Sequence, residues 1–276
     1  MDHAEIEAEY RRRAKTEHPD MGGSAERFAA LLAWRDKQLN PQVVDLGDGL
    51  HMTYIRHHSI GGMEIYVGVS SVVYVLPPEL DKVQDWPFAN DKMKKEMQKY
   101  LPELVRKKRN IQIYRRKPTQ VLMLDLVTPL EPQHVAWMVS RMMNLACYLS
   151  WAELSHCAIS PEFLLVDLET HGVALTGPAS YVTKMGVRPE AVPARTFGIV
   201  PSLGNKATVA TPKIDLSLVR STAMTLMGER NKAPFRQWLL SPPAATAFKD
   251  LEGWSNALGK RTFVKFPTTA KEIYNG

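Results

Sequence analysis

Residues 132–166 read PQHVAWMVSRMMNLACYLSWAELSHCAISPEFLLV, and this stretch carries the strongest indication of the fold. Over 132–154, apolar residues recur three and four positions apart, which is the spacing of one face of an α-helix. The stripe consists of Val135, Met138, Met142, Leu145 and Leu149. A stripe of methionine and leucine is typical of a helix packed in a core rather than of a cofactor site. The sequence therefore predicts a long buried helix that leads into a loop beginning at His156.

Upstream of this helix, short β-branched and aromatic runs alternate with glycine, which is the pattern of strands and turns. HMTYIRHH and MEIYVGVSSVVYVL flank Gly61 and Gly62, so two or three antiparallel strands with a glycine turn are expected over 43–75. A charged helix is expected over 90–100, and NIQIYRRK and QVLMLDLV indicate two further strands. Downstream, IDLSLVRSTAMTLMG indicates another helix. The predicted fold class is α+β, with a strand-rich part before a mostly helical part.

This order of elements is that of a protein kinase, and two segments make the resemblance specific. HCAISPEFLLV resembles the kinase catalytic loop, usually HRDLKPENILL, and it retains His156, Pro161 and Glu162. TPKIDLSLVRSTAMTLMG resembles the long buried helix of the lower lobe, with Asp215 retained at its start. The resemblance implies that Asp215 holds the backbone of the catalytic loop. It also implies a bilobed kinase-like domain over 41–276, with an upper lobe over 41–128 and a lower lobe over 129–276.

Other residues occupy the positions that carry the chemistry in this family. The resemblance places the catalytic aspartate at Ala158, the catalytic-loop lysine at Ser160 and the magnesium-binding asparagine at Phe163. The metal-binding Asp-Phe-Gly falls in GVALTGPAS, which has no aspartate, and the third strand, SSVVYVLPP, has no lysine to pair with Glu96. The degenerate site consists of Gly61, Gly62, Glu96, His156, Ala158, Ser160, Phe163, Thr176, Gly177 and Asp215.

Phosphoryl transfer depends on a lysine and metal ions that neutralise the phosphates and on an aspartate that orients the nucleophile. Because all of these parts are replaced, the sequence predicts a pseudokinase and not an enzyme, with no catalytic residue, no metal site and no cofactor. An unconventional kinase-like regulator that binds nucleotide stays open as an alternative.

The first part of the chain has a pattern of its own. YRRRAKTEHPD over 10–20 is followed by Gly22, Gly23 and SAERFAALLAWRDKQL. Pro19 moves His18 out of the helical region, and the glycines allow a tight reversal. Ser24 can cap a second helix that Asn40 and Pro41 would close. Residues spaced to pack the two helices together are Ile6, Tyr10, Ala14, Phe28, Leu31, Leu32 and Arg35.

This antiparallel hairpin resembles the second helix, His-Pro-Asp loop and third helix of a J-domain, the DnaJ-like module that docks on DnaK-type chaperones. We therefore expect a truncated J-domain-like hairpin over 1–40, whose basic helix steers docking and whose Asp20 engages the ATPase. The expected chaperone-binding residues are Tyr10, Arg11, Arg12, Arg13, Lys15, His18, Pro19 and Asp20. The predicted function is a co-chaperone or adaptor that binds a client protein through the kinase-like domain. The alternative is a structural or assembly protein with a vestigial hairpin.

Composition narrows the classes of protein further. The chain has 276 residues, 45% of them hydrophobic, and a formal net charge of +6. No apolar run approaches the roughly 20 residues of a membrane span, and the charged start does not resemble a signal peptide, so we expect a soluble, intracellular, cytoplasmic protein. Cys147 and Cys157 lack metal-ligand spacing and are expected to be buried thiols. The basic clusters could contact nucleic acid, but a solvated face is the commoner explanation.

Overall fold

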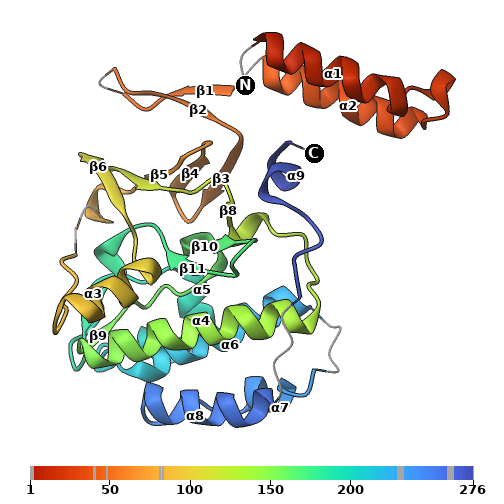
Figure 1. The fold of residues 1–276 in the computed structure, drawn as a ribbon. Coiled ribbons are helices and arrows are strands. Elements are labelled where there is room, and N and C mark those ends of the chain that lie inside the picture. The colour runs from red at the N-terminus through yellow and green to blue at the C-terminus, as the bar shows by residue number, and fades with distance from the viewer. Residues whose placement is uncertain are drawn as a thin grey trace.

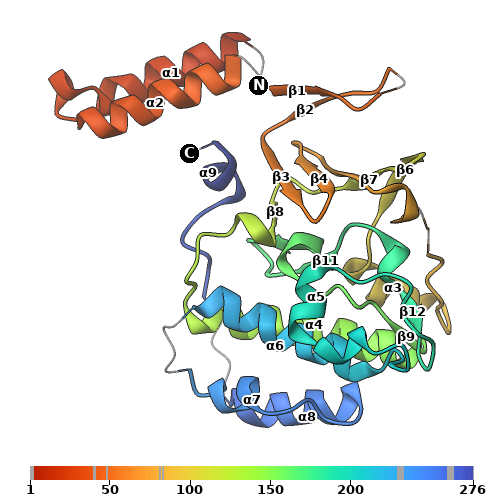
Figure 2. The same cartoon turned by 180° about the vertical axis from the view of Figure 1, so that it is seen from behind.

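The computed structural model describes residues 3–39, 42–47, 49–80, 82, 84–228, 233–259 and 264–275. Within them the chain forms a helical hairpin, a strand-rich lobe and a larger, mostly helical lobe (Figure 1). Figures 1 and 2 both place the hairpin at the strand-rich end of the molecule, with helix α8 at the opposite end. None of the helices in these residues is long and apolar enough to cross a membrane.

The N-terminal hairpin consists of helix α1 (His3–Glu17), the 3-10 turn η1 (Pro19–Met21) and helix α2 (Ala25–Leu39). The predicted end of the first helix near His18 is confirmed. The predicted cap is confirmed too, because the Ser24 hydroxyl accepts a hydrogen bond of 3.1 Å from the N–H of Arg27. Asn40 and Pro41, predicted to close the second helix, lie outside the described residues.

The hairpin has a small core of its own. Ile6, Leu31 and Trp34 are buried in it, and Tyr10 packs against it half-buried. The prediction that Leu32 packs on Tyr10 is wrong, since Leu32 is 37% exposed. Trp34, which the sequence analysis did not select, fills the core instead. Its large apolar area makes it the better residue to bury between two helices.

The strand-rich lobe is a five-stranded antiparallel sheet in the order β3-β4-β5-β7-β6. Its strands are β3 (Arg56–Ile60), β4 (Met63–Val67), β5 (Ser71–Val75), β6 (Leu104–Lys108) and β7 (Ile111–Arg115). Between β5 and β6 the chain forms η2 (Pro78–Leu80), helix α3 (Asp91–Met97) and η3 (Gln98–Tyr100). A separate ribbon of β1 (Gln42–Asp45) and β2 (His51–Tyr54) precedes the sheet. The predicted order of strands, a helix and further strands is confirmed, but β6 was not predicted. The two strands expected after the helix correspond to β7 and to Gln120–Leu122.

The second lobe is built on helices α4 (Pro132–Trp151), α6 (Pro212–Met227) and α8 (Ala247–Leu258). The remaining helices are α5 (Ala194–Ile199), α7 (Arg236–Leu240) and α9 (Ala270–Asn275). A small antiparallel sheet has the order β11-β10-β8, from β8 (Gln120–Leu122), β10 (Leu164–Asp167) and β11 (Val173–Leu175). Strands β9 (Leu154–Ser155) and β12 (Thr183–Lys184) pair separately.

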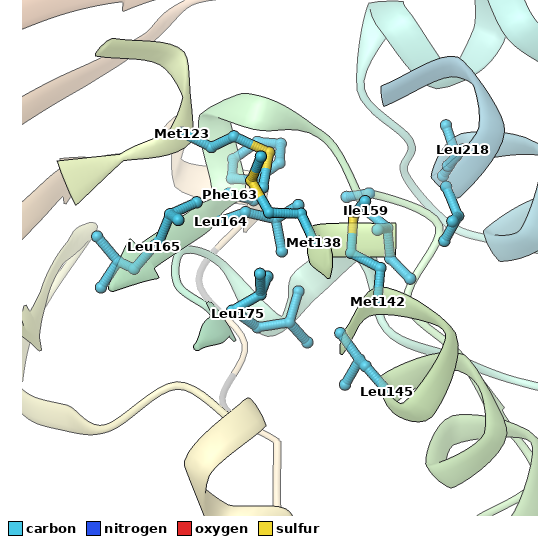
Figure 3. Close-up of a cluster of buried hydrophobic side chains, with 14 of the residues drawn as sticks. Met123, Met138, Met142, Leu145, Ile159, Phe163, Leu164, Leu165, Leu175 and Leu218 are labelled. Atoms are coloured by element: carbon cyan, nitrogen blue, oxygen red, sulfur yellow. The ribbon is translucent and has the colours of Figure 1, made fainter. Parts of the chain in front are cut away.

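The predicted stripe of the long helix lies in the core of this lobe. Figure 3 shows Met138, Met142 and Leu145 of α4 among apolar side chains from the small sheet and from α6. All five residues of the stripe are fully buried. The expectation that the methionine-rich face belongs to the core is therefore confirmed.

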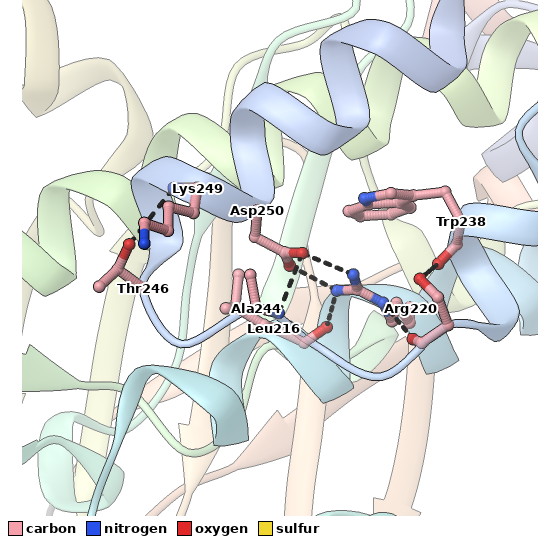
Figure 4. Close-up of polar contacts among 8 residues, drawn as sticks. Leu216, Arg220, Trp238, Ala244, Thr246, Lys249 and Asp250 are labelled. Atoms are coloured by element: carbon pink, nitrogen blue, oxygen red, sulfur yellow. Dashed lines mark hydrogen bonds and ion pairs between the residues drawn. The ribbon is translucent and has the colours of Figure 1, made fainter.

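A buried ion pair joins α6 to α8. The guanidinium of Arg220 donates to both carboxylate oxygens of Asp250, at 2.6 and 2.7 Å (Figure 4). It also donates to the carbonyls of Leu216 and Ser241, and it lies 3.9 Å from the ring centroid of Trp238. Both side chains are almost completely buried, so each charge depends on the other for its neutralisation.

The C-terminal helix α9 returns to the junction of the two lobes. The Tyr274 hydroxyl donates to Asp125 at 2.9 Å and accepts from the N–H of Leu122 at 2.8 Å. Arg56 of the upper sheet donates to the carbonyl of Ile273 at 3.1 Å. Residues more than 140 positions apart in the chain are thereby held together, which no local pattern in the sequence indicates.

Candidate functional site

The His-Pro-Asp segment forms the tip of the N-terminal hairpin. His18 is extended (φ −67°, ψ 135°), and its ring nitrogen Nδ1 accepts a hydrogen bond of 3.2 Å from the N–H of Asp20. The ring packs edge-on against the ring of Phe28, with the two ring centroids 4.5 Å apart, so α2 holds the imidazole in place. The Asp20 side chain is 86% exposed. The turn therefore presents a carboxylate to solvent on a rigid support.

Two glycines close this turn. Gly22 has φ +90°, a left-handed conformation that glycine adopts without strain. A Cβ atom on Gly23 would lie 2.1 Å from the carbonyl oxygen of Glu17, a distance that no side chain tolerates. Of the glycine pair that the sequence analysis selected, Gly22 is thus required by its backbone conformation and Gly23 by the close approach of the end of α1.

Some basic residues of α1 form ion pairs within the hairpin and others do not. Arg12 forms a double hydrogen bond to Glu9, and Arg13 pairs with Glu17 at 2.9 Å. Arg11 and Lys15 are exposed and have no ion pair with a described residue. The basic face predicted for this helix therefore contains two arginines that are paired locally, and Tyr10 lies against the hairpin core.

The catalytic-loop segment of the second lobe is held as its resemblance implied. The Asp215 carboxylate at the start of α6 accepts hydrogen bonds of 2.9 Å from the backbone N–H groups of His156 and Cys157. Burial raises the pKa of Asp215 to about 6, although the two N–H donors act in the opposite direction. Because the donors come from a loop 58 and 59 residues away, Asp215 fixes that loop relative to α6.

The other positions of the loop are filled by packing. Ala158 and Ser160 are fully buried. Phe163 stacks on Tyr74 of β5 with ring centroids 6.1 Å apart and packs at a tilt against Tyr181, with centroids 5.5 Å apart. Figure 3 shows Met123 beside Phe163. The position of the family's magnesium ligand is therefore part of an apolar contact between the lobes.

Tyr74 is the residue of this site that the sequence analysis missed. Its hydroxyl donates to the carbonyl of Glu162 at 2.9 Å, which ties the upper sheet to the loop. A Cβ on Gly177 would lie 2.7 Å from the Phe163 ring and 3.2 Å from the Tyr74 ring, so the two aromatic rings explain that glycine. Thr176, next to it, donates its N–H to the carbonyl of Phe163 at 2.8 Å. The signal available in the sequence was Tyr74 itself, the one aromatic residue among the valines of β5.

The remaining predicted positions are the glycine pair Gly61–Gly62 and Glu96. Gly61 and Gly62 form the turn between β3 and β4, and Gly61 lines a cavity of about 340 Å³ together with Glu162 and Phe163. Glu96 is exposed on α3 and pairs with Lys99 at 2.7 Å. The expectation that Glu96 belongs to the degenerate kinase site is wrong, because Met93 and Met97 of α3 and Tyr100 of η3 face the core while Glu96 faces solvent. Within the part of the chain that the structure describes, no three His, Cys, Asp or Glu side chains are grouped to hold a metal ion.

The buried imidazole of His156 predicts a pH dependence of stability. Burial lowers its pKa to about 4, so between pH 6.5 and 4 the unfolded chain binds a proton there that the folded chain does not. Its contribution to stability is complete above pH 6.5 and is lost as the pH falls. From pH 7 to pH 5 we expect this group to lower the free energy of unfolding by about 2 kcal/mol. His156→Leu should abolish this pH-dependent loss.

Urea denaturation at pH 7, 6 and 5 measures this difference. The raised pKa of Asp215 has the opposite effect on stability, because the stability that this carboxyl contributes is lost as the pH rises through about 6. The pH dependence of the variant must therefore be compared with that of the wild type. His51→Leu, at an exposed histidine of β2, is the control and should follow the wild type. Parallel pH curves for His156→Leu and the wild type would contradict the prediction.

Comparison with known proteins matches this chain to kinase structures. The kinase domain of Mycobacterium tuberculosis PknI has 12% identity and a TM-score of 0.48, over 77% of this chain and 100% of that chain. The structure of vaccinia related kinase 3 has 10% identity and a TM-score of 0.43, over 89% of this chain and 87% of that chain. No protein-family model matches the sequence, and no curated protein does either. Because both TM-scores lie below 0.5, the assignment of a protein kinase-like fold rests on the order of the described elements and on the Asp215 contacts.

One prediction is corrected by this comparison. The sequence predicted that the chain is not an enzyme, and this prediction is wrong, because the matched structures are kinases by name. Ala158, Ser160 and Phe163 show that the loop differs in sequence from that of kinases, and they do not by themselves show that the chain lacks activity.

Proposed function

We propose that this protein is a co-chaperone or adaptor whose N-terminal hairpin docks on a DnaK-type ATPase. In this proposal residues 1–40 are the docking unit, and the kinase-like body over 41–276 binds a client or assembly partner. The observation that carries it is the exposed His18-Pro19-Asp20 turn, held by a hydrogen bond of its own, at the tip of an antiparallel helical hairpin.

Three features of the hairpin support a docking role. Among the described residues, no lysine or arginine forms an ion pair with the Asp20 carboxylate, and the ring nitrogen Nδ1 of His18 lies 3.6 Å from it. The carboxylate is therefore available to a cationic partner. Arg11 and Lys15 supply free positive charge on the adjoining helix. Long-range attraction of this kind raises association rates and is screened by salt. We therefore expect docking to weaken markedly between 50 and 500 mM salt, on the order of tenfold or more.

The test is stimulation of a DnaK-type ATPase by the full chain and by His18→Gln. The ring of His18 positions Asp20 and packs on Phe28, and glutamine retains polarity but loses the ring contact. Loss of a contact worth about 2 kcal/mol weakens binding roughly 30-fold, so little stimulation should remain at sub-saturating concentration.

The matched control is His3→Gln, the same chemical change at an exposed position near the other end of α1. It should stimulate as the wild type does. Equal stimulation by His18→Gln and wild type, or no stimulation by either, would remove the proposal. Circular dichroism of the variants separates a lost contact from a lost hairpin.

A further inference from the structure

Basic residues from separate segments of the sequence line one groove where the two lobes meet. They come from α3 and η3, from the end of β7 and the segment after it, and from α4. Two cavities adjoin there, of about 490 and 260 Å³. Both are lined by Lys99, Lys117, Gln120 and Ala174, so they form one continuous hollow.

The groove is lined by more positively than negatively charged side chains. Its cations are Lys94, Lys95, Lys99, Arg115, Lys117 and Arg141. Its carboxylates are Glu103, which pairs with Arg115 at 2.5 Å, and Asp167, which accepts from Thr119 and from two backbone N–H groups. Lys99 pairs with Glu96, which lies outside the groove lining, whereas Lys94, Lys95 and Lys117 have no ion pair with a described residue. Several like charges held around one hollow repel one another unless an anion lies between them.

The walls of the groove are apolar and aromatic. Leu165, Ala174 and Leu175 of the small sheet contribute to its lining, and Trp86 and Phe88 lie at one end. Both aromatic side chains pack on Tyr148 of α4, with centroid distances of 6.5 and 6.0 Å, and so are held in place rather than free to collapse. Fixed aromatic faces beside lysines can stack bases while the lysines contact phosphates.

From this arrangement we propose that the groove binds single-stranded nucleic acid. The phosphodiester backbone lies along Lys94, Lys95, Lys99 and Lys117, and a base stacks at the Trp86 and Phe88 end. Cavities of a few hundred Å³ accept a nucleotide but not a double helix, whose bases are already paired and stacked. This activity goes beyond the proposed docking on a chaperone and uses a different part of the molecule.

The experiment is fluorescence anisotropy of the full chain with labelled dT20 and U20 oligonucleotides over 50–300 mM salt. For single strands the logarithm of the binding constant falls with the logarithm of salt by about 0.7 per phosphate contact. The double variant Lys99→Glu with Lys117→Glu removes two contacts and should flatten this slope by about 1.4. Its affinity at 50 mM salt should fall by at least roughly tenfold, because repulsion is added.

The matched control is Lys213→Glu with Lys249→Glu, which changes the net charge equally at exposed positions of α6 and α8. It should bind within about twofold of the wild type. A loss equal to that of the groove variant would mean attraction by net charge alone and would overturn the proposal. Equal binding of polyglutamate, or tighter binding of a 20-base-pair duplex than of the single strands, would overturn it as well.

Discussion

Asp215→Ala is expected to lower the free energy of unfolding by about 2–6 kcal/mol. The substitution leaves the backbone N–H groups of His156 and Cys157 without an acceptor, and each buried orphan donor costs about 1–3 kcal/mol. No water replaces the carboxylate easily, because Asp215 is 2% exposed and its two partners are buried. Urea denaturation at pH 7 measures the loss.

Hydrogen exchange gives this prediction a local readout. The amides of His156 and Cys157 should exchange much faster in Asp215→Ala, relative to amides in the upper sheet, because the contact that holds the loop is gone. Asp215→Asn keeps one acceptor oxygen and should lie between the alanine variant and the wild type. Asp91→Ala, an exposed aspartate in the first turn of α3, is the control and should change stability by only about 0.5 kcal/mol. A loss below about 1 kcal/mol for Asp215→Ala would contradict the anchoring role.

Asp250→Ala is expected to cost about 3–5 kcal/mol, because removal of one partner leaves the other charge buried. Arg220 would retain only the carbonyls of Leu216 and Ser241 and the face of Trp238. Chemical denaturation measures this loss, and exposure of Trp238 gives a fluorescence signal for opening between α6 and α8.

A double variant separates the cost of the orphaned charge from the value of the pair. Arg220→Met with Asp250→Leu replaces both charges by apolar side chains and should recover most of the stability, since such replacements are often neutral or stabilising. The control is Glu103→Ala, which breaks the exposed pair with Arg115 and should cost at most about 1 kcal/mol. If the double variant is no more stable than Asp250→Ala, the loss arises from packing and the electrostatic account fails.

The sequence predicted best the features that depend on near neighbours. The hairpin turn follows from Pro19, Gly22, Gly23 and Ser24 acting on their own backbone. The core helix α4 follows from its apolar spacing. The contact of Asp215 with the catalytic loop was also predicted, although through the resemblance and not through any local pattern.

The failures involve the direction in which a helix faces. Leu32 and Trp34 lie two positions apart on α2, and helical spacing alone did not show which of them meets α1. Glu96 was assigned to the degenerate kinase site, yet α3 turns it to solvent, where Lys99 pairs with it. In both cases the rotation of a helix about its axis is set by what it packs against, and that partner lies elsewhere in the chain.

The sequence by itself determined that a His-Pro-Asp turn ends the first helix, that strands precede helices, and that a buried helix leads into His156. Only the tertiary structure decided that Tyr74 meets Phe163 and that lysines from separate segments surround one groove. The physical reason is range: turns, caps and apolar periodicity act over a few residues, and the sequence displays them directly. Contacts such as that of Tyr74 with Glu162 join residues 88 positions apart, and they exist only once the whole core has packed.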